Sequence, residues 1–151
     1  MEILTGLRSI DDIRSSLRKD TLSSHDLVTY YAQRCYTIGR SLNLTTEELF
    51  TDAFEEASKC DEQRKRCLDG GKDPFKELGA LHGIPFSVKE QLAMKGCSTT
   101  LGVPSRAFVK EEEDAVLIEV IKSHGAIPFV RSNVPEICLM THSTNCIWGT
   151  A

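Results

Sequence analysis

Between residues 84 and 130 the chain alternates between a short apolar run, an amphipathic helix pattern and a second apolar run. Residues 84–88 are apolar and partly β-branched, with Gly83 before them and charge after them, which is typical of a buried strand. Residues 111–114 are acidic and place negative charge where a helix over residues 115–123 would begin, and His124-Gly125 mark its end. Residues 126–130 form the second apolar run. The pattern predicts a βαβ unit with two parallel strands and a right-handed crossover.

The first half of the chain has helical periodicity instead. We expect three helices there, because three sets of apolar residues recur at helical spacing. Two of them follow predicted capping boxes, at residues 23–26 and 45–48, and helix ends are expected at Gly39 and at Gly70-Gly71. The three apolar sets are Leu7, Ile10, Ile13 and Leu17; Leu27, Tyr31, Cys35 and Ile38; and Phe50, Ala53, Phe54, Ala57, Cys60 and Cys67.

Together these patterns predict an α/β fold. Residues 1–80 would form a helical layer, and residues 81–151 would form the first βαβ unit of a mixed sheet. Two strands are too few for a sheet that is stable alone. The 151 residues are therefore expected to be the N-terminal part of one larger domain.

Charge and composition exclude several functions. The net charge of −4 argues against nucleic-acid binding, which needs a surplus of Lys and Arg on one face. No apolar run is long enough to cross a membrane, and the first residues lack the pattern of a secretory signal. The six cysteines match no zinc-binding spacing, so we expect no metal. Because no export signal is visible, we expect reduced thiols and a cytoplasmic location.

Lys89 is the strongest candidate for chemistry, because it ends the first predicted strand. Ligands of parallel α/β sheets bind outside the carboxyl ends of the strands. A partly buried lysine there loses solvation of its ammonium group, which favours the neutral amine that can accept a proton. The alternative is a solvated charge at the end of a strand.

Other candidates have simpler structural explanations. Cys138 and His142 are four residues apart and could pair on a helix, but a thiolate nucleophile also needs an orienting group and an oxyanion site. Glu136 suits the first turn of a short helix for which Asn133 would be the N-cap. Residues 98–100 form a hydroxyl-rich loop without the Gly-Lys-Ser/Thr ending of a phosphate-binding loop.

Several segments, taken in order, resemble the amidase-signature enzymes. Residues 81–90, Leu-His-Gly-Ile-Pro-Phe-Ser-Val-Lys-Glu, resemble the strand that carries the family's catalytic lysine. Residues 98–102 resemble the Thr/Gly loop that follows it, and residues 114–116 and 125–136 resemble the next helix, strand and cap. The details at residues 88–90, 100–102, 127–130 and 133–135 are similar to the fatty-acid amide hydrolase branch.

The resemblance implies hydrolysis of fatty-acid amides and N-acylethanolamines by a Ser-Ser-Lys triad, without a cofactor. Lys89 would be the triad lysine, and Cys138 and Leu139 would line the acyl and oxyanion region. The implied partner is a small lipid amide. The resemblance also allows a homodimer and peripheral contact with intracellular membranes through downstream parts.

Both triad serines are expected in a Gly/Ser-rich segment that these 151 residues do not contain. Ser87 and Ser98 are present, but their presence alone does not make either of them a nucleophile. The 151-residue chain alone is therefore expected to be inactive. One alternative is a short amidase-like protein that acts as a non-catalytic binding or regulatory partner. Another is an unrelated βαβ binding module.

Overall fold

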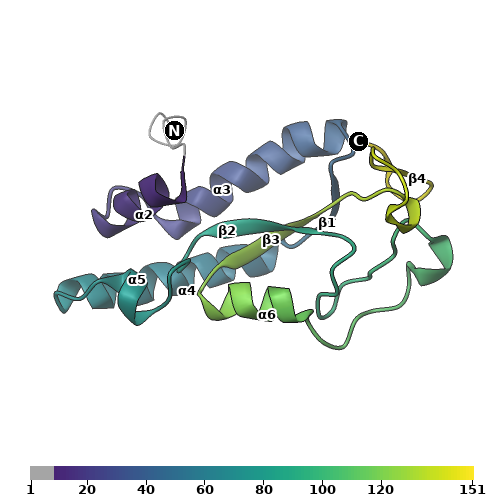
Figure 1. Cartoon of the computed structure of the whole chain (residues 1–151). Coiled ribbons are helices and arrows are strands. Elements are labelled where there is room, and N and C mark those ends of the chain that lie inside the picture. Colours follow the sequence, from purple (N-terminus) through teal and green to yellow (C-terminus); the bar gives the residue numbers. More distant parts are fainter. Residues whose placement is uncertain (1–8) are drawn as a thin grey trace. The chain divides into compact units, whose positions relative to one another are not determined.

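The structure is a computed structural model that describes residues 9–151, and it contains a three-stranded sheet in the order β1–β3–β2 (Figure 1). Strand β2 spans Pro85–Lys89 and β3 spans Ile127–Ser132, with helix α6, Val116–Ser123, between them in sequence. The backbone amide of Ile127 donates to the carbonyl of Ile84 at 2.9 Å, and that of Glu90 donates to Ser132 at 3.0 Å. The paired residues have higher numbers on both strands at the second bond than at the first, so β2 and β3 are parallel. The predicted strand–helix–strand unit is therefore confirmed.

The third strand, β1, spans Thr45–Glu48, where the sequence analysis predicted a capping box. That prediction is wrong. Residues Thr45 and Glu48 pair antiparallel with Ser132 and Val130 of β3. The β-branched threonines fit a pleated strand, and the Glu47 carboxylate binds Arg131 of β3 at 2.8 Å. Helix α4 therefore begins only at Phe50, and β3 becomes the central strand of the sheet.

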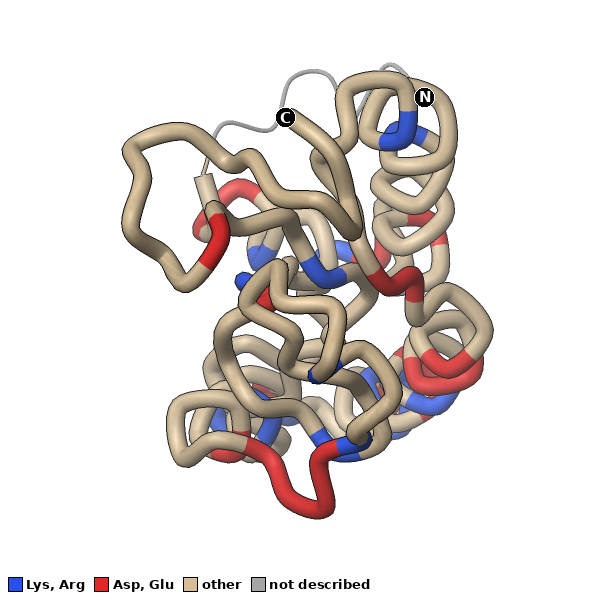
Figure 2. The backbone as a smooth tube through the Cα atoms, turned by 90° about the vertical axis from the view of Figure 1, so that its right-hand side faces the viewer, with Lys and Arg blue, Asp and Glu red and all other residues tan. Residues whose placement is uncertain are grey.

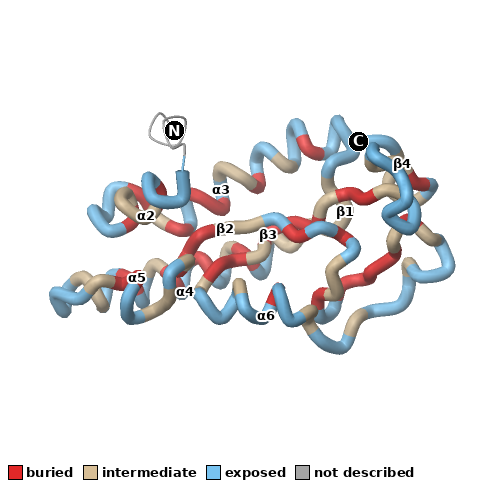
Figure 3. Tube along the Cα trace, viewed as in Figure 1, coloured by how far each residue is buried: buried red, intermediate tan, exposed pale blue. Residues whose placement is uncertain are grey.

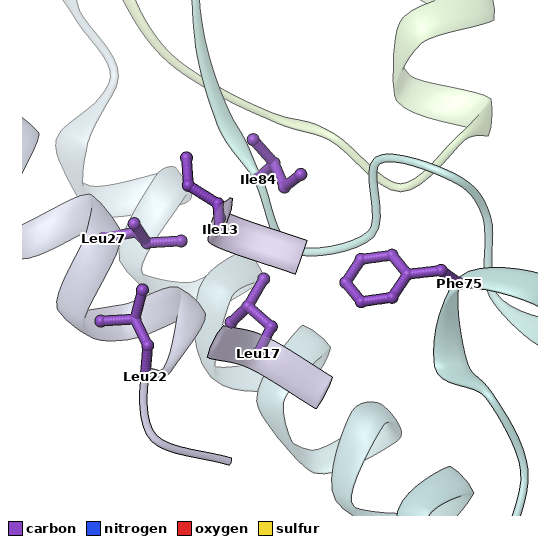
Figure 4. Close-up of a cluster of buried hydrophobic side chains, with 6 residues drawn as sticks. All are labelled: Ile13, Leu17, Leu22, Leu27, Phe75 and Ile84. Carbon is purple, nitrogen blue, oxygen red and sulfur yellow. The ribbon is translucent and has the colours of Figure 1, made fainter. Parts of the chain in front are cut away.

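The chain divides into two compact units whose segments alternate along the sequence. Within the described residues, the first unit contains residues 9–33, 50–86 and 121–129. Its helices are α2 (Ile10–Arg18), α3 (Ser24–Arg34), α4 (Phe50–Asp69) and the short α5 (Pro74–Glu77). Figure 4 shows an apolar core to which α2, α3, α5 and the segments next to α3 and β2 contribute, formed by Ile13, Leu17, Leu22, Leu27, Phe75 and Ile84.

The predicted helices of this unit are largely confirmed. Ser23 Oγ accepts from the amide of Asp26 at 2.9 Å, and the Asp26 carboxylate accepts from the amide of Ser23 at 3.1 Å, so the first capping box is real. The hydrogen bond from the Ser23 hydroxyl lowers the pKa of Asp26. Helix α4 ends just before Gly70-Gly71, as expected. Leu7, assigned to the first predicted helix, lies outside the described residues.

The second unit contains residues 34–49, 87–120 and 130–151. It includes a π-helical turn, Cys35–Gly39, which ends at Gly39, where the end of the second helix is predicted. Two 3₁₀ turns, η2 (Pro104–Arg106) and η3 (Glu136–Cys138), and the small hairpin β4–β5 (Thr144–Asn145 and Gly149–Thr150) complete it. Figure 3 shows that buried residues in this unit concentrate along β3 and the loop that follows β2.

Two predictions for this unit need correction. The acidic run 111–114, which is the continuous red stretch in Figure 2, lies before α6 and not in its first turn. There the Asp114 carboxylate accepts from the amide of Lys95 at 2.8 Å. Asn133 is not a helix cap, because the turn after it begins at Glu136 with Pro135 in the cap position.

We predict that Leu17→Ala lowers the free energy of unfolding by about 2–5 kcal/mol, because it opens a cavity in the core of the first unit. The matched control is Ile10→Ala on the same helix, where the side chain is 52% exposed and the expected change is within about 0.5 kcal/mol. Urea titration followed by circular dichroism measures both. Equal losses for the two variants would contradict the proposed core.

Candidate functional site

Lys89 is the last residue of β2, and Asn133 is the first residue after β3, so both lie at the carboxyl ends of the parallel strands. The Lys89 Nζ atom donates to the main-chain carbonyl of Asn133 at 2.8 Å. Within this chain the lysine side chain is exposed, and the partial burial expected from the sequence is not reached. The amine is thus held by a hydrogen bond at the ligand-binding edge of the sheet, and one side of it is left accessible.

The carbonyl that binds Lys89 belongs to a closely held peptide unit. The side-chain Nδ2 atom of Asn133 donates to the carbonyls of Asn43 and Gly149, at 3.0 and 3.2 Å. Its oxygen accepts from the amide of Val134 and from Asn145 Nδ2, both at 2.8 Å. All four hydrogen-bonding positions of this buried side chain are therefore used. Ser143 Oγ donates to the same main-chain carbonyl as Lys89, at 3.3 Å.

The Asn145 side chain is hydrogen-bonded in a similar way, and it contacts Asn133 rather than Lys89. Its Nδ2 atom also donates to the carbonyl of Val134 at 2.7 Å. Its Oδ1 atom accepts from the amides of Ile147 and Trp148, which fixes the turn between β4 and β5. The Asn145 side chain is also fully satisfied, so the two amides form one rigid polar pair behind Lys89.

The loop after β2 is organised by the residue next to Lys89. The Glu90 carboxylate is buried and accepts from the backbone amides of Thr100 and Leu101, one at each oxygen. Thr100 Oγ1 in turn accepts from the amide of Gly102 at 3.0 Å. At Gly102 φ is +72°, and a Cβ atom would lie 2.5 Å from that of Asn145, so this position requires glycine. The hydroxyl-rich loop predicted at residues 98–100 is therefore held at Thr100 by Glu90, while the amide of Ser98 donates to Glu47.

Arg131 of β3 ties the same region together from inside. The side chain is 0% exposed. Its guanidinium donates to the carbonyls of Glu90, Leu92 and Ser98 and to the Glu47 carboxylate of β1. Lys110 binds the same carboxylate at 2.9 Å. Burial raises the pKa of Glu47, but hydrogen bonds from Lys110 and Arg131 outweigh it, and the net pKa is lowered.

The segment around η3 holds the two other residues assigned to the site. Ile137 and Cys138 have φ values of +50° and +57°, a conformation that is costly for a β-branched side chain. Cys138 Sγ donates to Gln91 Oε1 at 3.1 Å, two residues beyond Lys89. The Leu139 side chain is 81% exposed. This strained turn therefore presents its apolar side chains outward.

The suggested pairing of Cys138 with His142 depends on an α-helix that the structure does not contain. The 3₁₀ turn η3 ends at Cys138, so a spacing of four residues no longer places the two side chains on one face. Among the described residues no group of three or more His, Cys, Asp or Glu is arranged to hold a metal ion. All six cysteines are free, and no helix in residues 9–151 combines the length and apolarity needed to cross a membrane.

Sequence reasoning missed Asn145, Ser143 and Arg131 as parts of this site. Arg131 carried a usable signal, because a charged residue that directly continues an apolar strand must either leave the sheet or find buried partners. Asn145 and Ser143 lie in a polar segment without periodicity, so nothing local distinguishes them.

Comparison with known proteins identifies the family. Residues 26–151 match the amidase family, and the chain belongs to it. It is 31% identical over 140 residues to Amidase 2 of Gibberella moniliformis (strain M3125 / FGSC 7600), a match that covers 93% of this chain and 26% of the relative. It is 30% identical over 137 residues to fatty-acid amide hydrolase 2-B of Danio rerio, covering 91% of this chain and 26% of the relative.

The fold is also similar to that of a solved structure. The chain superposes on a solved fatty acid amide hydrolase structure with a TM-score of 0.81 and 24% sequence identity, over 95% of this chain and 24% of that one. The α/β fold predicted from the resemblance to amidase-signature enzymes is therefore confirmed. The chain spans about a quarter of the length of the curated relatives that it matches.

The pKa of Glu47 predicts an acid-sensitive contribution to stability. Folding lowers the pKa of the Glu47 carboxylate, so this group stabilises the protein when the pH is above its unfolded-state pKa, here 4.5. The stabilisation is lost as the pH falls through the folded-state pKa. We therefore expect Glu47→Gln to be less stable than wild type at neutral pH, with the difference shrinking as the pH drops below 4.5. Urea titrations over a pH series measure it. A difference that is independent of pH would contradict the assignment.

Proposed function

We propose that this chain supplies the lysine of an amidase-signature active site and that Lys89 is that lysine. The observation that carries the proposal is the position of its amine, bound to Asn133 at the carboxyl ends of β2 and β3. Residues 81–90 support it further, because they resemble the strand that bears the catalytic lysine in this family. In this proposal the reaction is hydrolysis of a carbon–nitrogen amide bond.

In the proposed mechanism the Lys89 amine accepts a proton from a bridging serine, which takes one from the nucleophilic serine. The nucleophilic oxygen forms a bond to the amide carbon, and the proton returns through the bridging serine to the departing amine as the carbon–nitrogen bond breaks. Water then releases the acid by the same proton route. The hydrogen bond to Asn133 would hold Nζ in place while its accessible side faces the serine hydroxyl.

We propose fatty-acid amides and N-acylethanolamines as the substrate class, which would place the protein in lipid metabolism. The name of the Danio rerio relative supports this, as do the residues that resemble the fatty-acid branch. The exposed apolar side chains of Ile137, Leu139 and Met140 around η3 would contact the acyl chain. Cys138 would contribute mainly backbone to this surface.

The two serines would come from outside these 151 residues, which contain no Gly-Ser-Ser-Gly-Gly segment. In this proposal the 151-residue chain alone hydrolyses no amide, and the activity belongs to a longer polypeptide. A cytoplasmic or peripheral membrane location and a homodimer belong to the same proposal.

The first prediction of this proposal concerns the transcript. Sequencing the message beyond the codon for Ala151 should show a continuing frame that encodes a Gly- and Ser-rich segment with a serine pair. A stop codon directly after Ala151, with no spliced form that continues, would instead favour a non-catalytic amidase-like partner protein.

The second prediction concerns Lys89 in the longer polypeptide. Lys89→Ala should lower kcat/KM for a long-chain primary amide by at least about a hundredfold, because the base that accepts the serine proton is lost. Lys95→Ala removes an exposed lysine from the loop after β2 and should keep wild-type activity. The 151-residue chain serves as the inactive reference. Activity of Lys89→Ala within a few-fold of wild type would refute the assignment.

A further inference from the structure

Lys89 and the two buried asparagines are linked by an unbroken set of hydrogen bonds in the second unit. Lys89 Nζ binds the Asn133 carbonyl, and that carbonyl is part of the peptide unit whose N–H belongs to Val134. The Asn133 side chain holds this N–H, and Asn145 holds both the Asn133 side chain and the next carbonyl, that of Val134. The side chains of both asparagines in this set have all four hydrogen-bonding positions used.

We propose that Asn133 and Asn145 are positioning residues for Lys89, and this inference rests on the proposed function of that lysine. Their contribution is to fix the direction of the one carbonyl that holds the amine. They would touch neither substrate nor reacting atoms. The two side chains are a pair of buried, neutral amides, which orient the amine without placing a charge beside it.

The nearby Lys89 amine and the burial of both positions explain why Asn133 and Asn145 are amides and not charged residues. A carboxylate at either position would stabilise the ammonium form of Lys89, so less of the neutral amine would be available to accept a proton. A hydroxyl has only one proton and could not fill four bonding positions at once. Both asparagines are nearly fully buried, at 2% and 6% exposure, so any unpaired donor or acceptor there would be costly.

Ser143 provides the second donor on the same carbonyl, at 3.3 Å. A carbonyl oxygen has two lone pairs, so Lys89 and Ser143 occupy both. The lysine cannot shift to the second lone pair while Ser143 is bound, which restricts the amine to one direction. Ser143 therefore restricts the direction of the amine at the carbonyl, and the asparagines restrict the direction of the carbonyl itself.

The test is competitive labelling of lysines by acetic anhydride in the 151-residue chain, measured by mass spectrometry from neutral to strongly alkaline pH. In wild type at neutral pH, Lys89 should react about tenfold more slowly than exposed Lys95, a factor that corresponds to one charge-assisted hydrogen bond, and the difference should shrink at strongly alkaline pH. Asn145→Ser keeps an oxygen that can accept from the amides of residues 147 and 148 but cannot reach Asn133. This variant should bring Lys89 close to the rate of Lys95.

Lys110, which binds Glu47 in the same unit, reports on folding and should keep its wild-type rate in Asn145→Ser. Thr144→Ala removes a neighbouring hydroxyl contact and should change neither lysine. Asn133→Ala is the second variant, since it leaves the main-chain carbonyl in place but removes all four side-chain bonds. It should expose Lys89 in the same way.

Three results would overturn the inference. Lys89 could react as fast as Lys95 in wild type, or stay protected in both variants while Lys110 is unchanged. Loss of protection at Lys89 and Lys110 together in both variants would show that the amides hold the whole unit and not the lysine in particular. Labelling does not depend on hydrolysis, so a longer polypeptide without amidase activity would refute the proposed function and leave this result unaffected.

Discussion

The second unit depends on one buried cation, the Arg131 guanidinium. It lies on the central strand and binds three main-chain carbonyls and the Glu47 carboxylate of β1. Removing a charge of this kind from water is expensive unless it is paired, and here both terminal nitrogens have partners while Nε has none, so the surrounding backbone has few alternative arrangements. The loop that follows Lys89 is therefore fixed at both ends, by Arg131 at its start and by the Glu90 carboxylate at Thr100 and Leu101.

This rigidity explains how a single exposed amine could acquire a defined direction. Lysine has a long, flexible side chain, and holding it in one geometry costs conformational entropy. Here the cost is met by the Asn133 carbonyl, which is itself held by two fully paired amides. The same principle underlies precise placement in active sites, where a catalytic group is useful only if its supports do not move.

Sequence reasoning worked where periodicity and local chemistry agreed. The alternation of apolar runs located β2, α6 and β3, and the Ser23–Asp26 capping box was read correctly. It failed at residues 45–48, because Thr-Thr-Glu-Glu fits a helix start and a strand equally well locally, and the partner that decides between them, Arg131, lies far away in sequence. Lys89 was found from its place after a strand. The hydrogen bonds from Asn145 and Ser143 to Asn133 span 12 and 10 residues of sequence, and no periodic pattern marks them.

The central claim is that Lys89 serves as the proton-accepting amine of an amidase-signature site. The most direct measurement is a crystal structure of the longer polypeptide. The account predicts that Lys89 Nζ keeps its hydrogen bond to the Asn133 carbonyl and lies within about 3 Å of a serine hydroxyl from the added segment. An amine that points into solvent, with no serine hydroxyl within hydrogen-bonding reach, would contradict it.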